Sequence, residues 1–386
     1  MAQKEEALHW AVPEGMDPAE EERLYTAFRE WVDSMGFGYT AAAGEAAGAE
    51  LVMLKAFYTP DDVKYCMDMP TDAFFTVADF AEKEGFTEEK AFEILQDMAR
   101  RGNLYHEIRE DGRHYYHNEP AAHGIYEFHA GEFDLNWLGK GLYPTMAGGM
   151  LQVVYDAGIP FYRCVPADLS LVKDRDVLPD DDLFEMLKGH RRFCVSPCAC
   201  LDSSREWMGI HNCDHHVGVC LQTDEMADYY LDDLQLGHEV TYEQAAQMLK
   251  RNVEKGFALQ TTYAKKNEII CSCNLCHCGI LQAAKMFPGD AMNNISRYRI
   301  EQDREKWTGT CDIAPHCTMQ AIRYDEDGYP ITDDSCIGCG QCVRACTDGS
   351  RILVRKSDDE ILPLPDDVWG AYVAMEKNRR AKGALV

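Results

Sequence analysis

The stretch CIGCGQCVRAC, residues 336–346, decides the fold of the C-terminal part of this 386-residue chain. Its thiols Cys336, Cys339, Cys342 and Cys346 have the spacing C-x2-C-x2-C-x3-C. Three thiolates at two-residue intervals wrap a tight loop around three irons of a cubane, and the fourth cysteine of such a run normally ligates a different cluster. The run therefore predicts a [4Fe–4S] site in a small α+β unit, and it fits a cubane better than a tetrahedral zinc ion.

The residues before this run have the length and the residue pattern of the first half of a two-motif bacterial ferredoxin. CTMQAI ends that half and contains Cys317. Because the distal cysteine of one motif ligates the cluster of the other, we expect Cys317 to join Cys336, Cys339 and Cys342 on one cluster. The three-thiol loop before it is missing, and only Cys311 remains. Cys346 is then left over, and both it and Cys311 can equally be inert.

A second concentration of thiols lies upstream, where CSCNLCHC packs four cysteines into residues 271–278. Cytosolic reductants keep disulfides rare, and the odd total of seventeen cysteines fits a disulfide framework poorly. Metal is therefore the favoured interpretation, and two [4Fe–4S] clusters would use eight of nine thiols. The nine predicted cofactor-binding residues are Cys194, Cys198, Cys200, Cys213, Cys220, Cys271, Cys273, Cys276 and Cys278. All but Cys194 are expected to bind metal directly.

Several alternatives stay open for this upstream region. A structural zinc ion between Cys194 and Cys278 is the main rival, and a redox-active dithiol is another. Side chains of adjacent C-x-C pairs often point apart, so we expect each run to contribute to both clusters. Cys66 and Cys164 stand apart and are interpreted as small buried residues. Alternative ligands among the histidines are His211, His215, His216 and His277.

The rest of the chain predicts an α+β protein with a mostly helical N-terminal half. We expect a helical segment over 1–50, a winged-helix-like module over 51–135, a cysteine-rich iron–sulfur domain over 136–300, a ferredoxin-like domain over 301–358 and a helical tail over 359–386. Residue patterns, with caps at Asp17, Thr87 and Thr241, predict helices over 16–36, 58–69, 76–85, 87–102, 178–190, 241–256 and 364–383. An Asp111-Gly112 turn predicts a hairpin over 104–118.

The winged-helix-like module is predicted to bind protein and not DNA. Its recognition helix opens with Glu88 and Glu89, where Lys or Arg would face phosphates. Residues 71–127 carry 13 acidic and 6 basic side chains. The whole chain has a formal charge of −28, which repels nucleic acid and anionic membranes. Such acidity suits an electron carrier that docks on basic patches, or serves only solubility.

No apolar run of about 18 residues predicts a transmembrane helix. MAQKEEALHW at the N-terminus lacks the basic and apolar regions of a secretory signal. We therefore expect a cytoplasmic protein that does not insert into membranes.

Three segments, followed by the C-terminal run, resemble a family of ferredoxin-like 4Fe-4S binding proteins of anaerobes. They are CACLDSSREWMGIHNCDHHVGVCL, GHEVTYEQAAQMLKRNVEKGFALQTT and CSCNLCHCGIL. The resemblance covers residues 51–355 and implies an N-terminal winged-helix-like region and a C-terminal ferredoxin motif. Members carry an arginine at the fourth position of a CxCR sequence, where this chain has Leu201 in CACL. Many members also keep two full ferredoxin motifs. The resemblance implies electron transfer beside flavin- or metal-containing oxidoreductases.

The expected function is that of a non-catalytic electron-transfer subunit with two to three [4Fe–4S] clusters per chain. No dinucleotide fingerprint, phosphate-binding loop or catalytic triad signature is present in the sequence. Two alternatives remain, namely a redox-sensing winged-helix regulator and a zinc-stabilised scaffold.

Overall fold

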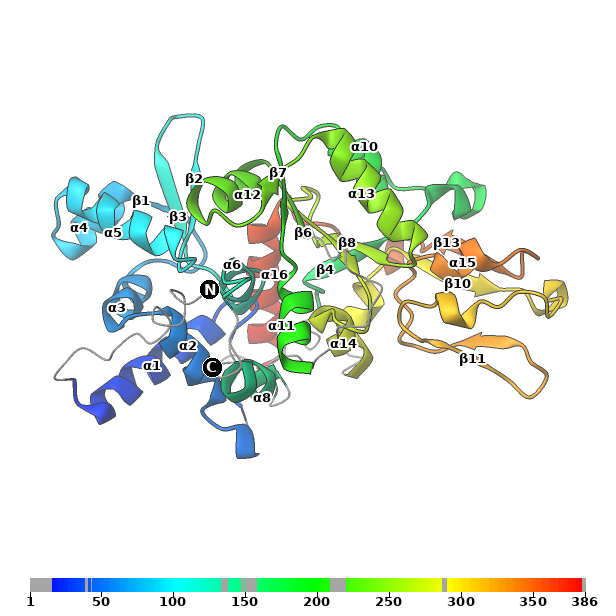
Figure 1. Cartoon of the computed structure of the whole chain (residues 1–386), viewed down its shortest axis with the longest axis horizontal. Helices are drawn as coiled ribbons and strands as arrows, with labels where there is room; N and C mark the ends of the chain where they lie inside the picture. Colours follow the sequence, from blue (N-terminus) through cyan, green and yellow to red (C-terminus); the bar gives the residue numbers. More distant parts are fainter. Residues whose placement is uncertain are drawn as a thin grey trace.

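The computed structural model has the α+β architecture that the sequence predicts (Figure 1). The structure describes residues 16–38, 41–42, 44–132, 138–146, 149, 158–208, 220–286 and 290–383. Helices of the N-terminal region lie at one end, a six-stranded sheet forms the middle and a small unit with short strands lies at the other end. Within these residues, none of the helices combines the length and apolarity that crossing a bilayer requires.

The N-terminal end contains the helices and the hairpin expected from the sequence, and also α2 and β1, which the sequence did not predict. Their bounds are α1 Pro18–Asp33, α2 Ala49–Phe57, α3 Pro60–Asp68, β1 Phe75–Thr76, α4 Val77–Glu84, α5 Glu88–Arg100, β2 Tyr105–Ile108 and β3 His114–His117. The three strands pair antiparallel in the order β1-β3-β2. Thr59 and Thr76 form capping boxes at α3 and α4, and Thr87 caps α5. These side chains accept hydrogen bonds from amides that lack a partner inside the helix. Local sequence therefore determines where each helix begins.

The middle of the molecule is an antiparallel sheet with the strand order β4-β8-β9-β6-β5-β7. The strands are β4 Tyr162–Val165, β5 Phe193–Ser196, β6 Cys220–Thr223, β7 His238–Glu239, β8 Ala258–Thr262 and β9 Ile269–Cys273. The helices of this region are α6 Tyr126–Phe128, α8 Tyr143–Thr145, α10 Leu183–Leu187, α11 Ala199–Met208, α12 Asp224–Asp228, α13 Tyr242–Glu254 and α14 Gly279–Met286. α13 starts at the predicted capping box of Thr241 and Gln244, and its Leu249 packs against Leu221 and Ile270 of the sheet.

The helix predicted over residues 178–190 is much shorter in the structure, where α10 has only five residues. A 3-10 turn over Pro179–Asp181 precedes it. Asp181 is buried in this turn, accepts a hydrogen bond from Arg163 on β4, and forms an ion pair with Arg297. This tertiary contact, which local sequence does not reveal, replaces the first part of the expected helix.

The C-terminal unit is built from two strand pairs and one short helix. Its elements are β10 Tyr298–Gln302, β11 Ile322–Tyr324, β12 Pro330–Thr332, α15 Gln341–Ala345 and β13 Arg351–Arg355. β10 pairs antiparallel with β13, and β11 with β12. The boundary expected at residue 300 falls inside β10. Gln341 and Arg344 donate hydrogen bonds to the carbonyl of Val253 at the end of α13, so this unit docks on the C-terminal end of that helix.

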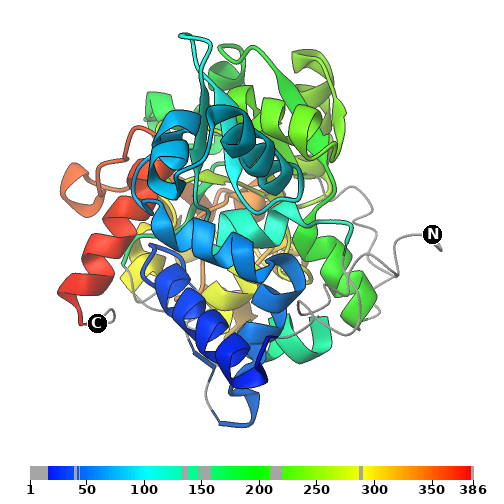
Figure 2. The ribbon, with the colours of Figure 1, turned by 90° about the vertical axis from the view of Figure 1, so that its left-hand side faces the viewer.

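The last helix, α16 Val368–Ala381, is drawn in red in Figure 2 and packs against the end of α1. Arg379 is 1% exposed and donates to the carbonyls of Asp33 at 2.8 Å and Met35 at 2.7 Å, beyond the end of α1. At the other end of α16, the amide of Val368 donates to Glu268 Oε2 at 3.0 Å. The tail therefore packs on the body of the molecule.

The buried carboxyl of Glu268 makes stability depend on pH. Burial raises its pKa from 4.5 to about 8, although Lys266 opposes the change. The folded state therefore holds an extra proton between these values, and its stability falls as pH rises through them, by at most about 1.4 kcal/mol per pH unit. Glu268→Gln keeps an oxygen for the amide of Val368 and should flatten this fall. Urea denaturation from pH 5 to 9 measures the effect, with exposed Glu301→Gln as the control; an unchanged slope in Glu268→Gln would contradict it.

Candidate metal centres

Four of the predicted thiols line one small cavity in the C-terminal unit. Cys317 follows a 3-10 turn, Cys336 and Cys339 lie in the loop after β12, and Cys342 lies in α15. The cavity has about 300 Å³ of empty space and is otherwise lined mainly by apolar side chains, those of Ile300, Met319, Ile322 and Ile337 among them. Residues that are 19 positions apart in sequence are thus brought to one apolar, thiol-lined space.

The loop between Cys336 and Cys339 has room only for glycine at position 338. Gly338 has a φ of +60°, and a Cβ there would lie 2.4 Å from the carbonyl oxygen of Tyr298. Its amide donates to Cys336 Sγ at 3.5 Å. The amide of Ala321 likewise donates to Cys317 Sγ at 3.2 Å. Amide donors of this kind stabilise negative charge on sulfur and are a lever on the potential of a bound cluster.

A buried arginine lies beside the same cavity. Arg351 is 2% exposed, and its Nη1 is 3.8 Å from Cys342 Sγ. The guanidinium also donates to Thr332 Oγ1 at 2.7 Å and to the carbonyl of Pro330 at 2.8 Å, which fixes its position. Burial raises the pKa of Cys342 to about 12, while Arg351 opposes the rise. Metal binding to this site must therefore release protons.

The spacing of these thiols bears on the choice between one ion and a cluster. A tetrahedral zinc ion with Zn–S bonds of about 2.3 Å needs sulfurs about 3.8 Å apart. In the part of the chain that the structure describes, only Cys311, Cys346 and Asp348 place three potential ligand atoms within 4.8 Å of one another. The cavity thiols are spread more widely than a single ion requires, which fits a larger group bound by four cysteines.

Six upstream thiols form a second group, in which Cys220, Cys273 and Cys278 are buried and Cys198, Cys200 and Cys271 are half-buried. The sulfurs of Cys220 and Cys271 hydrogen-bond at 3.7 Å, and each of the other four thiols shifts the pKa of at least one neighbour in the group. We call these residues the upstream thiol group. The neighbouring thiols Cys198 and Cys278 lower the pKa of Cys200, and Cys220 and Cys273 lower the pKa of Cys271. Burial and shared protons thus couple the thiols, as expected of a site that loses protons on binding metal.

The sheet explains how residues so distant in sequence meet. Cys220 on β6 lies opposite Cys271 on β9, and their sulfurs are 3.7 Å apart. Cys271 and Cys273 are two residues apart on β9 and therefore lie on the same face. The prediction that C-x-C side chains point apart is wrong for this pair, and also for Cys198 and Cys200. The period of two along a strand is the reason for the first pair.

The upstream thiol group as defined above does not include the predicted residues Cys194, Cys276 and Cys213. Cys194 lies on β5 and its thiol donates to the carbonyl of Leu236 at 3.6 Å. Cys276 Sγ lies 3.2 Å from His277 Nδ1. Cys213 and the predicted alternative ligands His211, His215 and His216 lie outside the described residues.

Polar side chains that sequence reasoning missed surround the upstream thiol group. Burial raises the pKa of Glu127 well above its usual range, and the thiols of Cys200 and Cys271 contribute. Burial also lowers the pKa of His123 to about 3. Tyr126 donates to the carbonyl of Ala199 at 3.0 Å, next to the thiols on α11. Glu127, His123 and Tyr126 lie in AAHGIYEF, and no metal-ligand spacing in the sequence could have identified them.

Strand β4 lies between the two thiol-rich sites. Tyr162 packs in the same cluster as Cys271 of the upstream thiol group, and after burial the charge of Cys271 contributes most to raising the pKa of Tyr162. Two residues later, Cys164 lies close enough to Cys339 and Cys336 for their charges to raise its pKa further, although burial is the main cause. The amide of Ala167, after the strand, donates to the carbonyl of Cys339 at 2.9 Å. Residues i and i+2 of a strand are roughly 7 Å apart, so both sites contact one short segment.

The fold and these sites define an α+β protein with two buried, thiol-rich centres. Comparison with family models, with curated proteins and with solved structures found no match for this chain. The assignment of a function therefore depends on the chemistry of the two sites.

Proposed function

We propose that this protein is a non-catalytic electron-transfer protein that holds two to three [4Fe–4S] clusters. Cys317, Cys336, Cys339 and Cys342 would hold one cluster, and the upstream cysteines one or two more. Such clusters accept and release single electrons. The observation that supports the proposal best is that β4 contacts both thiol-rich sites, because a relay needs its centres close together.

The chain's own residues supply the environment that a relay requires. Apolar side chains such as Ile300 and Ile337 exclude water from the C-terminal cavity. The amides of Gly338 and Ala321 donate to sulfur, and Arg351 places a fixed positive charge beside Cys342. Burial, hydrogen bonds to sulfur and local charge are the levers by which a protein sets a cluster's potential.

The partner that we propose is a flavin- or metal-containing oxidoreductase with a basic docking surface. The formal charge of −28 would attract such a surface at low ionic strength. The helix that a winged-helix protein would present to DNA is α5, whose first turn carries Glu88 and Glu89. This charge favours a protein partner over nucleic acid.

Anaerobic purification of the native protein tests the proposal. We expect a brown preparation with about eight to twelve irons per chain, at four for each cubane, and matching sulfide. Reduction with dithionite should bleach the visible absorption and produce the electron paramagnetic resonance of reduced clusters. A colourless protein that contains only zinc would contradict the proposal. Retardation of a DNA fragment at moderate salt would favour a redox-sensing regulator instead.

The charge of Arg351 should raise the reduction potential of the C-terminal cluster. Removing a positive charge several ångströms away disfavours the added electron, so Arg351→Gln should lower the potential by on the order of 100 mV at an effective dielectric constant of about 20. A redox titration followed by electron paramagnetic resonance measures this shift. Arg351→Lys keeps the charge and is the control, expected to shift the potential less. Equal potentials in the wild type and in Arg351→Gln, at unchanged iron content, would contradict the role.

A further inference from the structure

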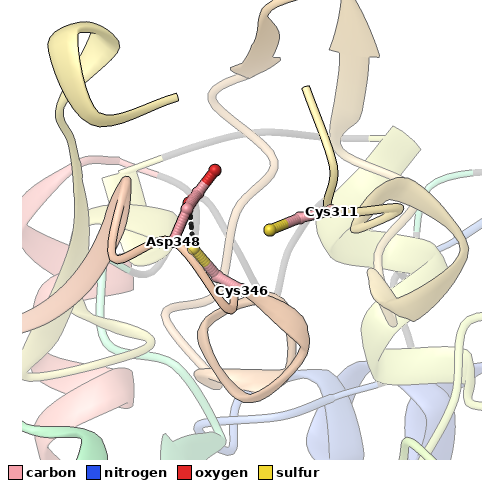
Figure 3. Close-up of side chains that lie close together, drawn as sticks. All are labelled: Cys311, Cys346 and Asp348. Carbon is pink, nitrogen blue, oxygen red and sulfur yellow. Dashed lines mark hydrogen bonds between the residues drawn. The ribbon is translucent and has the colours of Figure 1, made fainter. Parts of the chain in front are cut away.

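A third group of metal-binding side chains lies in the C-terminal unit, outside the cavity of the proposed cluster. The sulfurs of Cys311 and Cys346 and the carboxylate of Asp348 all lie within 4.8 Å of one another (Figure 3). Cys311 comes from the segment before Cys317, whereas Cys346 and Asp348 follow α15. The group therefore joins two segments that are 35 residues apart in the chain.

Hydrogen bonds hold these three side chains in place. Cys311 Sγ accepts from the amide of Thr347 at 3.2 Å and lies 3.2 Å from its hydroxyl. Asp348 Oδ1 accepts from Cys346 Sγ at 3.1 Å and from the amide of Ser350 at 3.0 Å, and Oδ2 accepts from the amide of Thr308 at 3.0 Å. The two sulfurs and one carboxylate are thus preorganised around one point.

This group is not the remnant of a second cubane site. Counting back from Cys317 with the spacing C-x2-C-x2-C-x3-C, the missing thiols would stand at positions 307, 310 and 313. These positions hold Trp307, Thr310 and Ile313, and Cys311 is out of register with all three. Ile313 is fully buried and packs, with Trp307, in the same hydrophobic cluster as Cys311. Ile313 and Trp307 therefore occupy two of the three positions at which such a cluster would need cysteine ligands.

We propose that Cys311, Cys346 and Asp348 bind a single zinc ion. Two thiolates and a carboxylate oxygen are ligands that zinc takes in tetrahedral sites, and a water molecule would be the fourth. The fourth position has access to solvent, because Cys311 lines an open groove together with Thr310 and Thr347. Closing the sulfurs to the roughly 3.8 Å separation of a tetrahedral site requires movement of about an ångström or less. The ion would pin the segment that carries Cys317 to the end of α15.

Metal analysis of the full chain, purified anaerobically and dialysed against a weak chelator, tests this site. We expect about one tightly bound zinc ion per chain, as one site holds one ion. Cys311→Ser and Asp348→Asn should each lose most of this zinc and keep the iron of the parent protein. Cys66→Ala removes a buried thiol of the N-terminal core and should keep both metals. Replacing zinc by cobalt(II) in the wild-type chain should produce thiolate-to-cobalt charge-transfer absorption, which Cys311→Ser should abolish.

Three results would overturn the assignment. The first is an unchanged zinc content in both Cys311→Ser and Asp348→Asn. The second is the loss of about four irons in Cys346→Ser, as expected of a cubane ligand. The third is a disulfide between Cys311 and Cys346 in the anaerobic protein. The test is independent of the proposed electron transfer. A chain without iron that still loses its zinc in Cys311→Ser would reject the electron-transfer proposal and leave the zinc site intact.

Discussion

Asp181→Asn is expected to lower the free energy of unfolding by about 3–5 kcal/mol, the cost of leaving buried charge uncompensated. The Asp181 side chain is 1% exposed and accepts a hydrogen bond from Arg163, which is also 1% exposed. It also forms an ion pair with Arg297 at 2.6 Å. Asparagine keeps the volume and removes the negative charge, so two buried guanidinium groups would lose their common partner. The midpoint of urea denaturation, followed by tryptophan fluorescence, measures the loss.

The neighbouring residue offers a matched control for this substitution. The Asp180 carboxylate is 43% exposed and lies 3.7 Å from Arg297. Exposed ion pairs contribute at most about 1 kcal/mol, so Asp180→Asn should change the midpoint little. Similar midpoints for Asp180→Asn and Asp181→Asn would show that the buried charges are compensated by other means.

Cys339→Ala is expected to remove about four irons per chain and their sulfide, because a [4Fe–4S] cluster depends on all of its cysteine ligands. Cys339 lines the C-terminal cavity with Cys317, Cys336 and Cys342. The upstream thiol group has no residue in this cavity, so its own iron should remain. Iron and sulfide analysis of anaerobic preparations, with the electron paramagnetic resonance of the reduced protein, measures the change.

Cys164→Ala is the control for this experiment. Cys164 is 2% exposed and lies against the same loop, but it does not line the cavity. The substitution removes a neighbouring thiol that is not a proposed ligand and should keep the full iron content. Loss of zinc in Cys339→Ala, with no iron in either protein, would replace the proposed cluster by a zinc site.

Local sequence predicted those parts of the fold that depend on neighbours in the chain. Helices α5 and α13 begin at the expected threonine caps, Thr87 and Thr241, because a cap bonds to amides two or three residues away. Helices α3 and α4 lie within their predicted ranges. The hairpin β2–β3 turns where Asp111-Gly112 was expected, with Gly112 at a φ of +74°. The spacing of Cys336, Cys339 and Cys342 likewise brings their thiols to one cavity, since a tight loop of that length has few alternatives.

Only the tertiary structure decided which distant residues meet. The pairing of β6 with β9 brings Cys220 to Cys271, and the same-face geometry of a strand overturns the expected separation of Cys271 and Cys273. Asp348, a possible ligand, became visible only when Cys311 was placed beside it. Strand pairing, buried charge and cavity shape are set by contacts between segments far apart in the chain. The spacing of residues within one segment cannot predict these contacts.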